Sequence, residues 1–385
     1  MHSKYMKPMF GSESIKNEIS QQAKSLSSSR TDLTSKLFSS IPERPTWLPA
    51  RIPEIDGFRG LAVLGVVIYH SKLRLVGTPL HDAALWGWTG VTLFFVLSGF
   101  LITSILLESR ARPHYFRNFY GRRILRIWPV YILALAVCYL KPGWFVNPEA
   151  DAPWWVYVLF VQNLFHITLP NAIGPTWSLA IEEQYYYLWA PVVRFLRRPW
   201  LLAVVLVTAL VVSPLVRLHH YAWITPTHTL SHLDGIAMGS MIALGLHVLK
   251  LDRRVWLMLG CFGIAVGFSS ATDRLAGGTA FLDSALAVGF GGAVLAAIAS
   301  TGARSPLNWL LRRGPLPFYG KISYGLYVTH IFVFIYFGWF DLKMDAFGIP
   351  GNLAVVALRL AASTALAAAL WYGLESRILR LKRYF

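Results

Sequence analysis

Cysteine and charge are scarce in this chain. Only two of its 385 residues are cysteines, Cys138 and Cys261, which excludes a disulfide framework, a zinc knuckle and an iron–sulfur cluster. Both cysteines lie within apolar stretches, so we expect both to be buried packing residues. Charged residues make up 14% of the chain and hydrophobic residues 55%, with a mean hydropathy of +0.48. This composition is typical of a membrane protein rather than of a large soluble domain.

Negative charge is especially scarce. Lys and Arg total 36 against 19 Asp and Glu, which gives a formal net charge of +17. In a soluble protein this excess would favour a nucleic-acid partner. Here the basic residues fall in short clusters between apolar stretches, as expected for the cytoplasmic loops of a membrane protein. We therefore expect membrane lipid, and no nucleic acid, among the partners.

Long apolar stretches are what the chain has in abundance, and ten of them are predicted to cross a bilayer. They lie at 56–76, 84–108, 127–142, 177–196, 200–218, 232–250, 255–271, 279–300, 322–340 and 352–372. The apolar stretch at 154–165 is too short to cross and is expected to form a re-entrant or interfacial helix. The predicted fold class is an all-α polytopic membrane protein of about ten transmembrane helices plus one short helix.

The basic clusters predict the orientation of these helices. Those at 110–126, 194–198 and 377–383 fall on the same side of the membrane when the ten crossings are followed in order. The positive-inside rule assigns that side, with both termini, to the cytoplasm. We expect an integral protein of the bacterial inner membrane in three parts: a disordered polar cytoplasmic tail at 1–50, a transmembrane domain at 51–376 and a basic cytoplasmic tail at 377–385.

Arg59 and His70 stand out within the first apolar stretch. They are eleven residues apart, with only Gly, Leu, Ala, Val, Ile and Tyr between them. In an α-helix this spacing puts both side chains on nearly the same face, about 16 Å apart along the axis. Such residues at membrane depth are costly and point to a functional cavity. The alternative is a pair of helix-end residues, with Arg59 reaching lipid headgroups and His70 bonded to a neighbour.

The next two motifs combine small and basic residues. GVTLFFVLSGFLIT (90–103) contains Gly90, Ser98 and Gly99, which are expected mainly to let helices approach closely. FYGRRILRIWPVY (119–131) is expected to be a basic loop at the cytoplasmic mouth. Its arginines either signal topology or bind phosphates as bidentate donors; they are Arg122, Arg123 and Arg126.

Acidic residues and a second histidine occur in the later spans. PTWSLAIEEQYYYLW (175–189) places Glu182 and Glu183 near the outer end of a span, where packing alone explains paired carboxylates poorly. Asp234 lies in SHLDGIAMG (231–239), and His330 ends GKISYGLYVTH (320–330). We treat all four as candidate site residues.

Taken in order, these motifs closely resemble the integral-membrane acyltransferase 3 family. The hallmark of that family is an Arg-x10-His pattern in the first span, which Arg59 and His70 match. A GVDLFFVLSGFLI-like span, an FYxRRxxRIxPxY motif, a WSLxxEExFY motif and an ISYGLYLxH-like span follow in the family order. The resemblance covers about residues 54–380.

The resemblance implies transfer of an acyl group, usually acetyl, from cytoplasmic acyl-CoA to a hydroxyl of an extracytoplasmic carbohydrate or glycolipid. Acyl-CoA is the expected co-substrate, and no metal is expected. The donor phosphates would bind to cationic side chains, namely Arg59, Arg122, Arg123 and Arg126. His70 would act either as the general base or as a nucleophile that forms an acyl-imidazole.

The remaining candidates would serve the histidine or the acceptor. Glu182 or Glu183 would orient His70 or bind the acceptor sugar. Trp177 offers a stacking surface for a sugar ring, and Asp234 and His330 are expected to support the acceptor site. Some family members carry an esterase-like domain after the membrane domain, which this chain lacks, so a separate extracytoplasmic partner is a further expectation.

The chain departs from the family pattern at two positions. Thr92 stands where the second motif usually has Asp, which puts a charge-based role there in doubt. His232 stands where a basic residue often precedes the Asp of the later motif. The sequence does not predict the identity of the acceptor.

Other classes of function remain as alternatives. A transporter or proton-coupled carrier would use the intramembrane Arg, His and Glu residues as a relay, but no internal repeat of the transporter kind is present. No residue in the sequence argues specifically for a lipid or sterol sensor. A metal site at His219, His220, His228 and His232 is conceivable, although no carboxylate motif accompanies these histidines.

Overall fold

The computed structural model describes residues 44–49, 51–145, 153–165, 171–219, 226–275, 280–303 and 305–385. These residues form helices and turns without strands. Most of the predicted polar tail at 1–50 lies outside the described residues. The predicted all-α class is confirmed.

Ten helices of 16 residues or more occur in the described part of the chain, one for each predicted span. They are α2 (Pro53–His70), α4 (Gly90–Ser109), α5 (Tyr115–Leu140), α8 (Trp177–Phe195), α9 (Pro199–His219), α10 (Leu233–Val248), α11 (Arg253–Leu275), α12 (Leu282–Ala299), α14 (Leu316–Tyr336) and α16 (Gly348–Leu370). Short α-helices connect them: α3 (Leu80–Leu85), α6 (Pro142–Phe145), α7 (Trp154–Val158), α13 (Pro306–Arg312), α15 (Gly338–Met344) and α17 (Ser376–Ile378). The remaining turns are the 3₁₀ segments Lys72–Leu75, Trp86–Thr89, Asn171–Thr176, Thr229–Ser231, Asp345–Phe347 and Leu379–Tyr384, and a π-helix at Trp371–Glu375.

Six helical segments have both the length and the hydropathy of a membrane span. They are Leu80–Ser109, Tyr115–Leu140, Pro199–His219, Arg253–Ala271, Leu282–Ala299 and Gly338–Tyr384. The other long helices are α10, which has 16 residues, and α2, α8 and α14, which carry more polar or charged side chains. The protein is therefore an integral membrane protein, and α2, α8 and α14 all contribute to the walls of the cavities described below.

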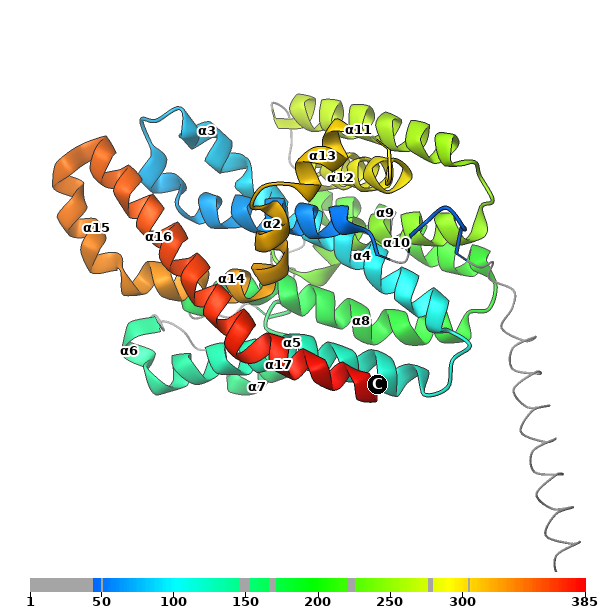
Figure 1. The fold of residues 1–385 in the computed structure, drawn as a ribbon, viewed down its shortest axis with the longest axis horizontal. Helices are drawn as coiled ribbons and strands as arrows, with labels where there is room; N and C mark the ends of the chain where they lie inside the picture. Colours follow the sequence, from blue (N-terminus) through cyan, green and yellow to red (C-terminus); the bar gives the residue numbers. More distant parts are fainter. Residues whose placement is uncertain are drawn as a thin grey trace, which may run out of the picture.

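Glycines bring two pairs of helices into backbone contact (Figure 1). A Cβ atom at Gly99 of α4 would lie 1.9 Å from a backbone oxygen of α10, and a Cβ at Gly239 of α10 would lie 1.9 Å from one of α4. Gly60 of α2 and Gly320 of α14 make the same kind of contact, at 2.1 and 1.8 Å. No side chain fits at these distances, so the predicted packing role of Gly99 is confirmed.

Two expectations from the sequence are wrong. Residues 115–126 do not form a loop, because α5 begins at Tyr115 and its arginines lie on the first turns of one continuous helix. Cys138 is buried, but Cys261 is exposed on α11. A membrane helix turns part of its apolar surface to lipid, so an apolar position in a span need not be buried within the protein.

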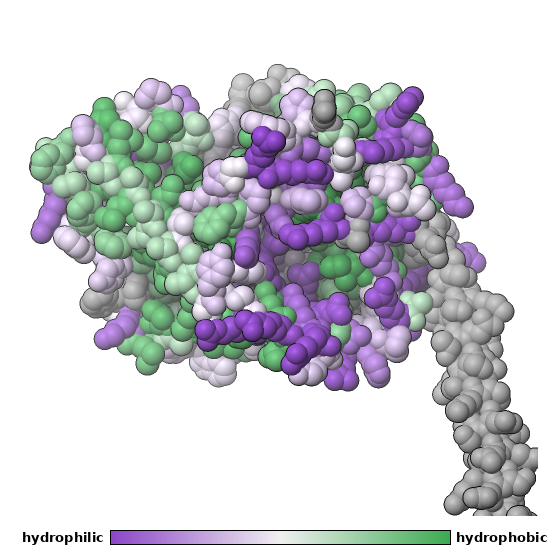
Figure 2. Space-filling model, in the orientation of Figure 1, coloured by the Kyte–Doolittle hydropathy of each residue, from purple (hydrophilic) through white to green (hydrophobic). Residues whose placement is uncertain are grey.

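One end of the helical bundle is strongly basic, and we call it the basic end. It contains the loop after α4, the junction between α8 and α9, and the C-terminal 3₁₀ segment. Arg110 joins the first two, donating from Nη2 to the carbonyl oxygen of Leu196 at 2.7 Å. The C-terminal segment lies beside α5 (Figure 1), where Arg122 Nε donates to the backbone oxygen of Phe385 at 2.9 Å. Hydrophilic residues cover the area around the C-terminus, whereas apolar residues cover α15 and α16 (Figure 2).

Candidate active site

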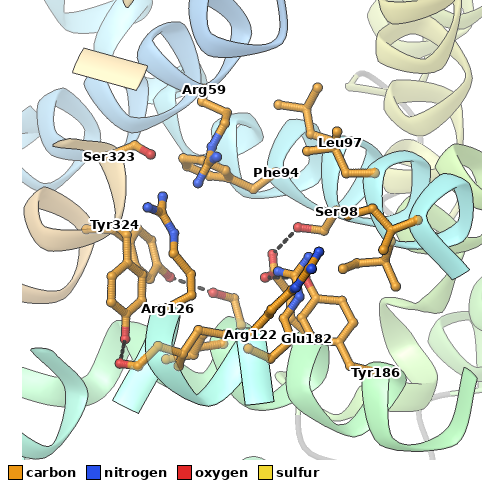
Figure 3. Close-up of a pocket in the computed structure, with 18 of the residues that line it drawn as sticks. Arg59, Phe94, Leu97, Ser98, Arg122, Arg126, Glu182, Tyr186, Ser323 and Tyr324 are labelled. Carbon is orange, nitrogen blue, oxygen red and sulfur yellow. Dashed lines mark hydrogen bonds between the residues drawn. The ribbon is translucent and has the colours of Figure 1, made fainter. Parts of the chain in front are cut away.

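A cavity of about 450 Å³ lies toward the basic end, and we call it the basic cavity. Its walls come from α2, α4, α5, α8 and α14 together with the C-terminal segment. Five cationic side chains line it: Arg59, Arg122, Arg123, Arg126 and Lys382. Arg59 and Arg126 point toward each other across the cavity in Figure 3. The structure thus brings together all four arginines that the sequence singled out.

These cations are poorly neutralised. Arg59 makes no hydrogen bond or ion pair with any described residue. Arg123 lies over the ring of Tyr186 at 5.0 Å and Arg126 over the ring of Trp371 at 5.6 Å, so both contact aromatic rings rather than carboxylates. Among the described residues that line the cavity, Glu182 is the one carboxylate. A cavity in which five cationic side chains face a single carboxylate is a ready site for an anionic ligand.

Glu182 is held inside the basic cavity and not beside His70. Ser98 Oγ donates to Glu182 Oε1 at 2.9 Å, and the Tyr186 hydroxyl donates to Oε2 at 3.0 Å (Figure 3 shows the Ser98 contact). Glu183 is buried, its Oε1 has no hydrogen-bond partner among the described residues, and it lines neither cavity. The expectation that one of these carboxylates orients His70 is therefore not met. Ser98, expected mainly to pack, also donates a hydrogen bond to Glu182.

A second cavity of about 430 Å³ lies at the other end of α2, and we call it the histidine cavity. Residues from α2, α4, α8, α12 and α14 and from the segment before α10 line it. Its polar and aromatic lining includes His70, Thr92, Trp177, His232 and Asp283. Arg59 and His70 therefore share a helix, but they open into different cavities.

The hydrogen bonds of His70 assign its protons. Nδ1 lies 2.8 Å from the carbonyl oxygen of Val66 and 3.3 Å from Nε2 of His330. His330 Nδ1 lies 2.8 Å from the carbonyl oxygen of Tyr327. Carbonyl oxygens only accept, so both Nδ1 atoms carry hydrogens and His330 Nε2 is an acceptor. The unprotonated nitrogen of neutral His70 is thus Nε2, which has no partner among the described residues.

Val91 and Tyr327 line both cavities, so the two cavities are neighbours at these residues. The Tyr327 hydroxyl donates to the carbonyl oxygen of Pro175 at 2.6 Å. Its single hydrogen is then committed, so Ser178 Oγ donates to the Tyr327 oxygen at 2.6 Å. These two bonds join α14 to the start of α8 at the boundary between the basic cavity and the histidine cavity.

Two acceptor-site candidates differ in position. Trp177 lines the histidine cavity. Asp234 lines neither cavity and lies behind the wall, where Arg217 Nη2 is 2.7 Å and Ser284 Oγ is 2.6 Å from its Oδ2. Asp234 is thus part of a buried ion pair that supports the wall.

His228 and His232 are not joined by further ligands, since no group of three His, Cys, Asp or Glu residues suited to a metal occurs in the described part of the chain. His220 lies outside the described residues.

Sequence reasoning missed three residues that line the cavities. Tyr327 lies in the same motif as His330, three residues earlier, which places both on one face of α14 and was a usable signal. Asp283 is an acidic residue at the start of an apolar helix, which the cost of intramembrane charge also marks. Lys382 gave no signal, because only the fold brings the C-terminal segment to the mouth of the basic cavity.

A comparison with known proteins decides the family. The model of the acyltransferase domain known as acyltransferase 3 matches residues 52–372, most of the chain. This chain belongs to the acyltransferase 3 family. The resemblance seen in the five sequence motifs is confirmed, and an acyltransferase domain occupies these residues.

Curated relatives match a shorter region. The chain is 35% identical over 153 residues to the peptidoglycan O-acetyltransferase OatA of Listeria monocytogenes, which is 36% of this chain and 23% of the relative. It is 32% identical over 163 residues to the O-acetyltransferase OatA of Staphylococcus aureus, covering 38% and 26%. It is 35% identical over 156 residues to the putative peptidoglycan O-acetyltransferase YrhL of Bacillus subtilis, covering 36% and 23%. The matched part of the chain thus spans about a quarter of each relative, and no solved structure matches the chain.

Proposed function

We propose that this protein is a membrane O-acyltransferase that moves an acyl group, expected to be acetyl, from cytoplasmic acyl-CoA to a hydroxyl of an extracytoplasmic carbohydrate. The observation that carries the proposal is the arrangement of the two cavities. One contains Arg59, Arg123 and Arg126 with no described carboxylate bound to them, the other contains a histidine with a free Nε2, and Val91 and Tyr327 line both cavities.

The basic cavity suits the donor. The phosphates of acyl-CoA need cations, and Arg59, Arg123 and Arg126 have no described carboxylate bound to them. Arginine matches the geometry of a phosphate as a bidentate donor. The eleven residues from Arg59 to His70 correspond to about 16 Å of helix, on the order of the length of an extended phosphopantetheine arm. The thioester would therefore reach His70 after passing Val91 and Tyr327.

His70 supplies the chemistry at the thioester. Its Nε2 takes the proton from the acceptor hydroxyl as the hydroxyl oxygen bonds to the thioester carbonyl carbon. The C–S bond then breaks, and the imidazolium returns the proton to the departing CoA thiolate. A nucleophilic route, in which Nε2 itself bonds to the acyl carbon before the acceptor arrives, uses the same nitrogen.

His330 serves His70 as a positioning residue. By accepting from Nδ1–H together with the Val66 carbonyl, it keeps the imidazole in the tautomer that exposes Nε2. It also stabilises the imidazolium that forms when Nε2 gains a proton. This is the part that a carboxylate plays in a serine hydrolase triad, supplied here by a second imidazole.

The relatives guide the choice of acceptor. Two of those named above are called peptidoglycan O-acetyltransferases, and peptidoglycan is a carbohydrate polymer with free hydroxyls. We infer a carbohydrate acceptor of the cell envelope for this chain. With the basic end in the cytoplasm, as the positive-inside rule predicts, the histidine cavity would face the acceptor on the outer side.

The proposal is tested with purified protein and radiolabelled acetyl-CoA. We expect acetyl-CoA to bind, CoA thiol to be released, and label to appear on an added peptidoglycan fragment. Protein without substitution that releases no thiol would contradict the proposal. Uptake of an intact solute into proteoliposomes without any acyl transfer would favour the carrier instead.

A further inference from the structure

The histidine cavity contains a carboxylate that the proposed reaction does not use. Asp283 lies in the first turn of α12, and its carboxylate lines the cavity. Its Oδ2 lies 3.8 Å from Arg217 Nη1 and 3.9 Å from His232 Nδ1. Both separations are too long for a hydrogen bond. Asp283 thus makes no hydrogen bond with a described residue, although its side chain is only 16% exposed.

The groups around Asp283 are held firmly in place. Arg217 is occupied by other partners, because its Nη2 binds Asp234 at 2.7 Å and its Nε donates to the carbonyl oxygen of Ala280 at 2.7 Å. His232 Nε2 lies 2.9 Å from the carbonyl oxygen of Pro226, so Nε2 is the donor and Nδ1 faces Asp283. Asp283 and His232 therefore present two fixed polar atoms to the cavity.

The gap between these atoms fits one ligand oxygen. A hydroxyl oxygen about 2.8 Å from both Asp283 Oδ2 and His232 Nδ1 spans their separation of 3.9 Å, with an angle of about 90° at that oxygen. It would donate its hydrogen to the carboxylate, giving a charge-assisted hydrogen bond, and would accept the Nδ1 hydrogen of His232 when that imidazole carries a proton on both nitrogens. The second carboxylate oxygen would remain free for a neighbouring hydroxyl or amide N–H.

An aromatic surface stands beside this pair. The indole of Trp177 lies 5.0 Å from the imidazole of His232, measured between ring centroids, and 6.3 Å from the ring of Phe95. All three residues line the same cavity as Asp283 and His70. An apolar ring face next to a few fixed polar groups is how a pocket recognises a ring-shaped ligand with polar edges.

We propose that Asp283 and His232 form the specificity pair of a pyranose subsite, in which the sugar ring packs on Trp177. One hydroxyl of the ring bridges Asp283 and His232, and this directs another hydroxyl of the same residue toward His70 Nε2. The proposal rests on the proposed acyl transfer and adds a substrate class, a neutral sugar residue with a free hydroxyl next to the one acylated. A carboxylate in this position disfavours an acceptor that is anionic there.

Asp283→Ala separates acceptor binding from donor chemistry. We measure acetyl-CoA hydrolysis without acceptor, and acetyl transfer to a panel of neutral disaccharides from peptidoglycan and exopolysaccharide. Loss of a charge-assisted hydrogen bond should raise the acceptor KM about ten- to hundredfold. Hydrolysis and the KM for acetyl-CoA should stay as in the unsubstituted protein. The matched control is Asp82→Ala, an exposed acidic residue of α3 that lines neither cavity.

A set of monodeoxy acceptors makes the test specific. One deoxy analogue should lose at least the same factor with the unsubstituted protein but clearly less with Asp283→Ala, where only the contact to His232 remains to be removed. An unchanged acceptor KM in Asp283→Ala would overturn the subsite. So would a rise in KM in Asp283→Ala that is fully additive with the rise caused by every deoxy analogue, or acetyl transfer to a serine-containing protein but to no sugar. Absence of both hydrolysis and transfer in the unsubstituted protein would instead overturn the proposed acyl transfer itself.

Discussion

His330 Nε2 lies 3.3 Å from His70 Nδ1, and the two imidazoles meet edge to face with centroids 4.9 Å apart. His330 is fully buried on α14, whereas His70 ends α2 and lines a cavity. Two helices far apart in the sequence thus set the direction in which the free nitrogen of His70 points.

Replacing His330 should lower turnover without weakening the binding of either substrate. His330→Leu removes one of the two acceptors of His70 Nδ1–H and leaves the Val66 carbonyl, so we expect kcat to fall about 10- to 100-fold, toward the lower end of the range of a positioned acid–base group. Both KM values should change little. His330→Gln can accept through its amide oxygen and should recover part of the activity. Equal failure of the two variants, or a rise in KM alone, would contradict a positioning role.

Replacing Arg59 should affect the donor. Arg59→Ala removes a bidentate phosphate contact and should raise the KM for acetyl-CoA about ten- to hundredfold. Arg59→Lys keeps a point charge and should retain part of the affinity. Arg51→Ala is the control, because Arg51 precedes the same helix and its side chain is 84% exposed. Normal acetyl-CoA kinetics in Arg59→Ala would mean that Arg59 only anchors the helix end.

Replacing Gly99 should destabilise the bundle. In Gly99→Ala the new methyl group meets a backbone oxygen of α10 at 1.9 Å, and overpacking of this kind costs about 1–3 kcal/mol. Thermal unfolding in detergent measures the loss. Gly338→Ala should be neutral or slightly stabilising, since no atom lies within 4 Å of its added Cβ. Equal stability of the two variants would contradict the close contact of α4 with α10.

Topology can be checked with fused reporters. The positive-inside rule predicts that a reporter after Phe385 lies in the cytoplasm and that one inserted near Asn147, outside the described residues, lies on the other side. Protection of each site from a membrane-impermeant label provides the measurement. If both sites report the same side, the number of crossings differs from the predicted one and the donor and acceptor would not enter from opposite sides.

Sequence reasoning predicted the helices well because hydropathy is a local property. All ten predicted spans contain a long helix, although α5 begins twelve residues before its predicted start at 127. That error arose because charged residues were taken to mark a loop. Arg122, Arg123 and Arg126 are compatible with a helix when they face a polar cavity, and only the tertiary fold reveals that cavity.

Sequence reasoning predicted which residues belong to the candidate site better than it predicted which of them contact one another. The spacing of Arg59 and His70 indicated a functional helix face, and the structure places the predicted arginines in one cavity. Sequence could not pair His70 with His330, since 260 residues separate them and nothing local encodes that contact. For the same reason, sequence reasoning assigned the role of orienting His70 to Glu182 or Glu183.

The central claim is that His70 Nε2 performs the transfer, and His70→Asn tests it most directly. Asparagine keeps polarity and similar bulk but can act neither as base nor as acyl-accepting nucleophile. In protein shown to be membrane-inserted and to bind acetyl-CoA normally, we predict a loss of acetyl transfer of about 10²–10⁴-fold or more. Label from acetyl-CoA retained on the unsubstituted protein without acceptor, and absent from His70→Asn, would identify the nucleophilic route. Full transfer by a correctly inserted His70→Asn protein would contradict the account and make His70 a structural residue.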